Sequence, residues 1–205
     1  MKYNGPKARK VRRYGVNLYI SDKYDKILQK KPYGPGKNAK TRQGRDSEYA
    51  KQLKEKQRAR DMYGLSERQF RRLYDESSRA KGQTGDMMKS LLEQRLDNVI
   101  YRAGFAQTRL QSRQFAGHGL FLVNGIRVTS PSYRVKAGEV IEARPRAKSS
   151  PIMAQIREKN AKYSAPKWLR VDSANMKAEV AVNPAAEDAE QAIDMRQVVE
   201  FYSRN

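Results

Sequence analysis

The sequence predicts an α+β protein: an extended basic N-terminal arm, a mostly helical first domain and a small inserted domain of helices and a short-stranded sheet. Three observations indicate this. Apolar residues recur at helical spacing from Ser47 to Ala103, with capping residues at the helix starts. Two apolar runs flank Asn124-Gly125, which is typical of a tight β-hairpin. Lys and Arg number 43 against 22 Asp and Glu, giving a net charge of +21.

The excess of positive charge indicates a polyanionic partner. The sequence pI near 10.2 goes far beyond what solubility requires. Nucleic acid and an anionic membrane are the two candidates, and the sequence favours nucleic acid because no apolar run approaches the ~20 residues of a spanning helix. No signal-peptide pattern is present either. Residues 172–205 hold 3 Lys and Arg against 7 Asp and Glu, so we expect this acidic part to face away from the polyanion.

The chain contains no Cys and a single His. This composition excludes disulfides, thiolate metal sites and a Cys nucleophile, and it fits a reducing compartment. His118 has no partner set for metal binding or nucleophilic catalysis, so we interpret it as a structural or RNA-contacting ring. We therefore expect no metal and no cofactor.

The first 45 residues are the most basic segment, with 14 Lys and Arg against 2 Asp and Glu. Residues 1–15 have no acid and almost no apolar periodicity, and residues 30–46 add two Pro and three Gly. We interpret residues 1–45 as an extended arm with little secondary structure, whose cations displace counterions from a phosphate backbone. A solvated tail or an organellar transit peptide is the alternative for residues 1–15.

Residues 46–90 are expected to form the helical domain. A helix begins near Ser47, where Asp46 or Ser47 can cap it, and Gly64 ends it. Ser66 to Gln69 form a capping box, which opens a second helix with apolar residues at i, i+3 and i+4 that ends at Gly82. The last apolar run, 197–202, is too hydrophobic to remain in solvent. We expect residues of about 196–205 to complete this domain.

Residues 91–195 are expected to form the inserted domain. A third helix begins near Asp86 and ends at Gly104, and Thr108 opens a short fourth helix through a second capping box. Four arginines then fall on these two helices at spacings that suggest one exposed face: Arg95 with Arg102, and Arg109 with Arg113. Guanidinium groups suit phosphate oxygens, and the helix start at Thr108 adds backbone donors. Asp97 is interpreted as orienting a neighbouring Arg.

The strands of the inserted domain follow these helices. Asn124-Gly125 predicts a type I′ hairpin that packs beneath the helices, and Gly138 precedes a strand over 139–144. Ser150 and Pro151 open another helix, which Pro166 ends. Two further strands are predicted over 168–171 and 178–182, with Trp168 in the core.

Several motifs run in order along the whole chain: QLKEKQRAR, YGLSERQFRRLY, KGQTGD, RLDNVIYRAGFAQTRLQSRQ, VNG, PSYRVKAG, PKWLRVD and VEFYSR. On these motifs the chain resembles the universal family of small-subunit ribosomal protein four, of bacterial type. The segment 95–146 is similar to the RNA-binding domain named S4 after this family, which also occurs in some pseudouridine synthases and tyrosyl-tRNA synthetases.

The resemblance implies a structural protein of the small ribosomal subunit, in the cytoplasm, that binds a multi-helix junction of ribosomal RNA early in assembly. It also implies neighbours among the small-subunit proteins, namely proteins three and five, and a position on the path by which messenger RNA enters. A role in translational accuracy and, in some bacteria, repression of the protein's own message follow in the same way. The protein is expected to be a monomer outside the ribosome.

The sequence departs from the family pattern at a few positions. Some members carry four N-terminal Cys that bind a metal or cluster, and this chain has none. His118-Gly119-Leu120 stands where two histidines usually flank the glycine, and Ser130 replaces an apolar residue. Leu120 and Ser130 are therefore poor candidates for contact.

The residues expected to contact RNA are the cations of the arm and first helices, together with polar groups of the inserted domain. They are Lys2, Lys7, Arg9, Lys10, Arg12, Arg13, Lys51, Lys54, Arg58, Arg68, Arg71, Arg72, Lys81, Arg95, Arg102, Thr108, Arg109, Gln111, Arg113, Gln114, His118 and Asn124.

Two other classes of function remain as alternatives. An RNA-modifying enzyme that carries the same module would need a catalytic domain, but the rest of the chain shows no paired-acid, Gly-rich nucleotide or nucleophile constellation. A free translational repressor or RNA chaperone would differ from a ribosomal protein only in that it does not remain bound to the small subunit. We therefore expect no catalytic residues.

Overall fold

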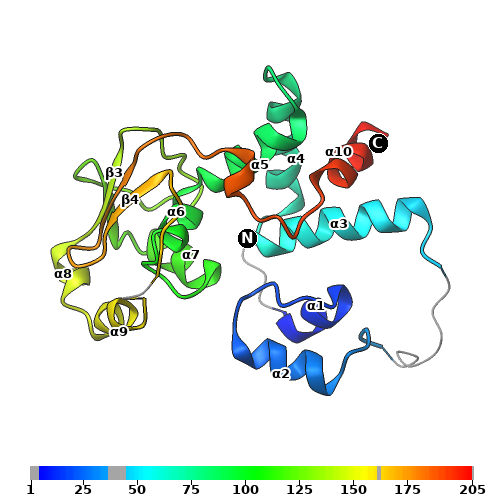
Figure 1. Cartoon of the computed structure of the whole chain (residues 1–205), viewed down its shortest axis with the longest axis horizontal. Coiled ribbons are helices and arrows are strands. Elements are labelled where there is room, and N and C mark those ends of the chain that lie inside the picture. Colours follow the sequence, from blue (N-terminus) through cyan, green and yellow to red (C-terminus); the bar gives the residue numbers. More distant parts are fainter. Residues whose placement is uncertain (1–4, 37–44, 161–162, 205) are drawn as a thin grey trace. The chain divides into compact units, whose positions relative to one another are not determined.

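The protein is described by a computed structural model covering residues 5–36, 45–160 and 163–204, and it forms two compact units (Figure 1). Unit 1 comprises Met1–Gly85 together with Gln191–Asn205, and unit 2 comprises Asp86–Glu190. Both divisions lie about five residues before those expected from the sequence. Helices and a five-stranded antiparallel sheet confirm the α+β class.

Unit 1 begins with two helices, α1 (Lys7–Tyr14) and α2 (Asp22–Lys30), so the prediction of little secondary structure is wrong for this part of the arm. Only a few apolar residues, Val11, Leu18 and Tyr19, are buried here. Hydrogen bonds from a polar side chain also hold the helices in place. The Arg12 guanidinium donates to the carbonyls of Tyr33 and Gly34 at 3.0 and 2.9 Å. Hydrogen bonds of this kind leave no periodic pattern in the sequence. The spacing of hydrophobic residues therefore did not predict these helices.

The next two helices begin where the sequence predicts. In α3 (Glu48–Met62) the Ser47 hydroxyl accepts from the backbone of Ala50, and in α4 (Glu67–Arg79) Ser66 and Gln69 form the reciprocal capping box. Both caps satisfy backbone donors that a helix start leaves unpaired. The second helix ends at Arg79, three residues before the predicted glycine.

The C-terminal helix α10 (Met195–Ser203) packs against α3, which confirms that the last apolar run docks on the body. Val198, Phe201 and Tyr202 are buried. The Tyr202 ring stacks on Tyr74 with 4.8 Å between ring centroids, and the Phe201 ring lies 5.6 Å from that of Tyr49. Aromatic contacts therefore join the C-terminal helix to α3 and α4 within unit 1.

A partly buried polar cluster reinforces this junction. Lys56 donates to Glu67 at 2.8 Å, the Tyr202 hydroxyl donates to the same oxygen at 2.7 Å, and Arg60 donates to the other oxygen at 3.0 Å. Burial by itself raises the pKa of Glu67, but the hydrogen bonds from Lys56 and Tyr202 outweigh it, so the pKa is lowered. Burial and the bond to Glu67 raise the pKa of Tyr202.

This cluster should make unit 1 sensitive to acid. A carboxylate whose pKa is lowered by folding stabilises the folded state above its unfolded pKa, and that contribution is lost as pH falls through the folded pKa. We expect the melting temperature to fall more steeply for the wild type than for Glu67→Gln as pH is lowered from about 5 to about 3. Thermal melts monitored by circular dichroism across this range test it; parallel curves for the two proteins contradict it.

The chain passes from unit 1 to unit 2 within α5 (Thr84–Glu93), which is followed by a separate helix, α6 (Leu96–Arg102). The prediction of one continuous third helix is wrong. Arg95 is extended at φ −65°, ψ 136° and forms an isolated bridge with Arg134. The neighbouring amides pair with the same segment, Leu96 with the carbonyl of Tyr133 and Val135 with that of Gln94. At this point, backbone hydrogen bonds to residues 133–135 thus replace the hydrogen bonds of a continuous helix.

The sheet of unit 2 has the order β2-β1-β3-β5-β4, with all neighbours antiparallel. Its strands are β1 (Phe121–Val123), β2 (Ile126–Arg127), β3 (Val140–Ala143), β4 (Leu169–Asp172) and β5 (Lys177–Val180). Asn124 and Gly125 have φ of 50° and 79°, which confirms the type I′ turn between β1 and β2.

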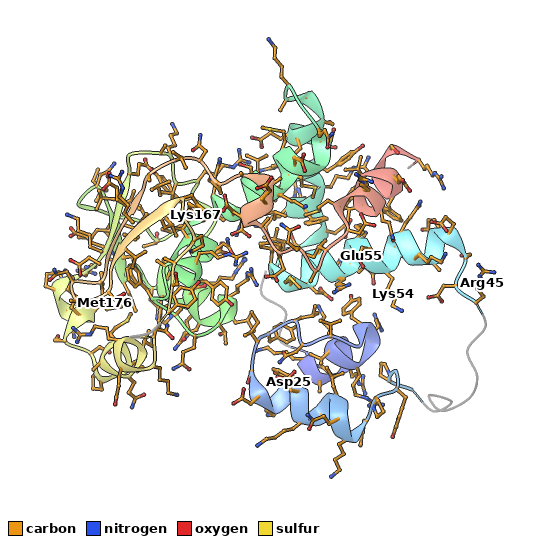
Figure 2. All side chains as sticks on the ribbon, in the orientation of Figure 1. Asp25, Arg45, Lys54, Glu55, Lys167 and Met176 are labelled. Carbon is orange, nitrogen blue, oxygen red and sulfur yellow. The ribbon has the colours of Figure 1, made fainter. Side chains whose placement is uncertain are left out.

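The core of unit 2 lies between this sheet and its helices. Phe105 stacks on Phe121 with 5.8 Å between ring centroids, and Trp168 is fully buried as predicted. Around the core lie α7 (Arg109–Gly117), α8 (Pro145–Lys148), α9 (Pro151–Lys159) and a short 3-10 turn at Ala186–Asp188. Met176, labelled in Figure 2, is buried in the turn between β4 and β5.

Candidate nucleic-acid interface

The four arginines of the inserted domain meet around α6 and α7, but acidic side chains hold them. Their side chains are only 5% (Arg95), 17% (Arg102), 10% (Arg109) and 16% (Arg113) exposed. Three carboxylates, those of Glu93, Asp97 and Glu190, pair with them. The expectation of one freely exposed arginine face is therefore wrong, because the fold pairs most of this charge internally.

Glu93 is the centre of this cluster. It is fully buried, and its carboxylate accepts two hydrogen bonds from Arg102, at 2.8 and 3.1 Å. The amide of Asn98 donates to it at 2.6 Å, while the amide oxygen of Asn98 accepts from Arg109 at 3.0 Å. A buried carboxylate needs such a complete set of donors. The chain of bonds fixes the orientation of two arginines.

Asp97 performs the same role for the other two arginines. It accepts from Arg95 at 3.1 and 2.8 Å and from Arg113 at 3.4 Å, which confirms the interpretation of Asp97 as an orienting acid. Burial lowers the pKa of Arg113, partly offset by Asp97. Arg95 is too buried to touch a ligand directly, so it supports Asp97 and Arg113 from within.

Arg109 has the most varied surroundings of the four. Its guanidinium lies over the Tyr101 ring at 4.7 Å and donates to Glu190 at 3.1 Å. Because its Nε also donates to Asn98, the ring contact and these two bonds fix the plane of the guanidinium group. Arg109 is also the first residue of α7, where Thr108 caps the backbone amide of Gln111 at 3.2 Å.

The second half of the predicted capping box differs in detail. The Gln111 side chain accepts from the amide of Gln107, at 2.8 Å, instead of from that of Thr108. Gln111 therefore stabilises the residue before the cap. Thr108 thus caps α7, and Gln111 holds the segment that precedes it.

The other polar candidates of unit 2 are more accessible. Gln114 and His118 are exposed at the end of α7, and Arg127 of β2 donates to the His118 carbonyl at 3.3 Å. Asn124 is exposed, and its side-chain oxygen accepts from the Val140 amide at 2.9 Å, so it first of all fixes the hairpin. Gly119 has φ of +64°, a conformation that residues with a side chain rarely adopt, and it lies against the Arg127 side chain.

Unit 1 provides most of the solvent-exposed candidates. The side chains of the following cations are exposed on α1, α3, α4 and the segment after α4: Arg9, Arg13, Lys51, Lys54, Arg68, Arg71, Arg72 and Lys81. Lys54 and Glu55 are adjacent on α3 (Figure 2). The Lys54 side chain is half exposed, and its Nζ lies 3.8 Å from a carboxylate oxygen of Asp46. Ion pairs of this exposed kind are weak and leave the cation available to a phosphate.

Other cations of unit 1 have structural partners. Lys10 pairs with buried Asp61 at 2.6 Å, Arg58 pairs with Glu55 at 3.4 Å, and Lys7 lies over the Tyr19 ring at 5.8 Å. Arg12 holds the chain after α2, as described above. Lys2 lies outside the described residues.

Sequence reasoning missed two features of this interface. Glu93 stood in an apolar run, LLEQRL, where a lone acid at a buried position signals a paired cation. Arg146 is exposed on α8, a helix that the sequence analysis did not predict, although Pro145 at its first position is a usual start signal.

Within residues 5–36, 45–160 and 163–204, no cluster of three or more His, Asp or Glu is arranged to bind a metal ion. Over the same residues, no helix combines the length and apolar character needed to cross a membrane.

Comparison with known families matches both parts of the chain. Residues 2–93 match the model described as "Ribosomal protein S4/S9 N-terminal domain", and residues 94–141 match the S4 domain. The border between the two matches falls at Glu93, at the end of α5.

Curated relatives match over nearly the full length. The chain is 44% identical over 206 residues to the protein named small ribosomal subunit protein uS4 of Chloroflexus aurantiacus, which covers 99% of each chain. It is 45% identical to the protein of the same name from Treponema denticola, with 100% of each chain covered, and 43% identical to that of Cutibacterium acnes, with 99% covered.

Proposed function

The chain belongs to the uS4 family of small ribosomal subunit proteins, and we propose that it acts in the small subunit by binding a multi-helix junction of its ribosomal RNA early in assembly. The family is one of structural ribosomal proteins and is not known for enzymes. The observation that carries the proposal for this chain is the set of exposed cations on α1, α3 and α4, in a protein of net charge +21.

The recognition we propose depends on shape and phosphates. The major groove of A-form RNA is too deep and narrow for side chains, so proteins contact its backbone and shallow groove instead. The ion-paired arginines of unit 2 suit this because their orientation is fixed before binding. In this proposal unit 2 sets the position on the RNA, and the exposed cations of unit 1 supply much of the electrostatic attraction.

Further roles form part of the same proposal. We propose that the protein lies beside small-subunit proteins three and five in the cytoplasmic ribosome, on the path by which messenger RNA enters, and influences translational accuracy. Repression of its own message would use the same RNA-binding surface. These roles rest on family membership.

The test is the salt dependence of binding to small-subunit ribosomal RNA. Each phosphate that is neutralised releases counterions, so we expect the affinity to fall by about 10³ or more between about 50 and 200 mM salt. Filter binding or fluorescence anisotropy with the full chain measures this. A flat response contradicts the proposal. Co-sedimentation with small subunits after a high-salt wash separates a resident ribosomal protein from a free repressor.

A further inference from the structure

A pocket in unit 2 lies outside the arginine cluster and the hairpin. It is formed by the end of α7, the start of β1, α8 and α9, and we call it the α7–α9 pocket. The described residues that line it are Phe115, Leu120, Arg144, Arg146, Ala147, Ser150, Ile152 and Met153.

The structure around the α7–α9 pocket is held by several specific bonds. The Arg144 amide donates to the Leu120 carbonyl at 2.9 Å, which joins the end of β3 to the start of β1. Arg157 of α9 donates to the Lys148 carbonyl at 3.4 Å, which ties α9 to the end of α8. The pocket is therefore present before any ligand binds, which reduces the cost of ordering on binding.

The chemistry of the pocket is divided into an apolar floor and a basic rim. Phe115, Ala147 and Met153 are buried members of the floor. Arg146 is exposed at the rim, and none of the described residues that line the pocket is acidic. A ligand that fits must have an apolar face and a negative charge next to it.

Ile152 extends this apolar surface into solvent. It lies on α9 with 52% of its surface exposed, beside buried Met153. A large aliphatic side chain exposed at the mouth of a pocket provides a surface on which a planar group can lie.

The volume of the pocket limits the size of the ligand. The volume of the pocket, which is open to solvent, is about 210 Å³, below the ~300–1,000 Å³ typical of sites that enclose a drug-sized molecule. One planar group fits inside it, and the rest of a longer chain would lie outside.

We propose that the α7–α9 pocket binds the base of one unpaired nucleotide of the ribosomal RNA, with the adjoining phosphate on Arg146. Unpaired bases that project from folded RNA are recognised by stacking on apolar, aromatic or guanidinium surfaces. This inference rests on the proposed function and deepens it, because it assigns a specific contact to a part of the protein that phosphate attraction does not require.

The first experiment identifies the ligand. Ile152 is replaced by benzoylphenylalanine, and small subunits reconstituted with the full-length variant are irradiated. A crosslink to one unpaired nucleotide is expected. A crosslink to a neighbouring protein, to paired RNA only, or to no discrete position overturns the proposal.

The second experiment separates stacking from charge. Ile152→Ser is expected to weaken binding to the ribosomal RNA by about tenfold, the scale of one lost stacking contact, without changing the slope of affinity against salt. Arg146→Gln is expected to lower both the affinity and the slope. The matched control is Val182→Ser, at a residue 58% exposed beyond β5, which should leave both unchanged.

The two proposals fail in different ways. If the wild type shows no salt-dependent binding to the ribosomal RNA, the proposed function fails. If the wild type binds normally and Ile152→Ser is indistinguishable from Val182→Ser, only the nucleotide pocket is excluded. Equal melting temperatures for the variants show that a loss of affinity does not arise from unfolding.

Discussion

Replacing Glu93 with Ala is expected to lower the free energy of unfolding of unit 2 by about 3–5 kcal/mol, the cost of removing one member of a buried ion pair. Glu93 is fully buried and bonds to both Arg102 and Asn98. Without it, the Arg102 guanidinium loses its bidentate partner in a site that is mostly closed to water. Asn98, which also accepts from Arg109, loses the bond that orients it.

The chain provides its own reporter for this measurement. Trp168 is the only Trp and lies in the core of unit 2, so its fluorescence during urea unfolding follows that unit. Glu158→Ala is the matched control, because Glu158 is exposed on α9. A change for Glu93→Ala no larger than that for Glu158→Ala would show that the cluster contributes little to stability.

A triple substitution of Arg9, Arg68 and Arg72 with Gln is expected to cause the largest loss of RNA binding with the fold intact. All three are exposed, on α1 and α4. The slope of log affinity against log salt should fall by about one for each phosphate contact removed, and so by up to about three. The corresponding loss of affinity at low salt is at least about tenfold.

The control removes the same number of positive charges from the acidic part of the sequence, residues 172–205. Lys177, Arg196 and Arg204 are also exposed, and replacing them with Gln changes the net charge equally. Anisotropy titrations of both triple variants at several salt concentrations compare them directly. Equal losses would show that net charge alone, and not the position of the arginines on α1 and α4, governs binding. The four ion-paired arginines are unsuitable for this test, since their removal would also destabilise unit 2.

The parts of the fold that short-range signals specify could be predicted from the sequence. Ser47, Ser66 and Thr108 cap the helices they were expected to cap, and Asn124-Gly125 forms the expected turn. These features depend on neighbouring residues alone. Trp168 is buried at the start of a predicted strand, as expected.

Features that depend on distant partners could not be predicted in this way. The break at Arg95 arises from pairing with the segment around Arg134, about forty residues further on. The helices of the arm depend on Arg12 reaching backbone carbonyls, and no periodic pattern records such a contact. For the interface, helical spacing placed the four arginines together correctly, but it could not show that Glu93 and Glu190 would pair with them.

The position of α10 has a consequence for biosynthesis. Unit 1 consists of the first part of the chain and the last fifteen residues, whereas unit 2 is one continuous segment between them. Synthesis proceeds from the N-terminus, and domains generally fold as units as they emerge. Unit 2 can therefore complete its fold first, although it is made second. The first segment of unit 1 must wait, without Phe201 and Tyr202 to cover α3, until α10 has left the exit tunnel.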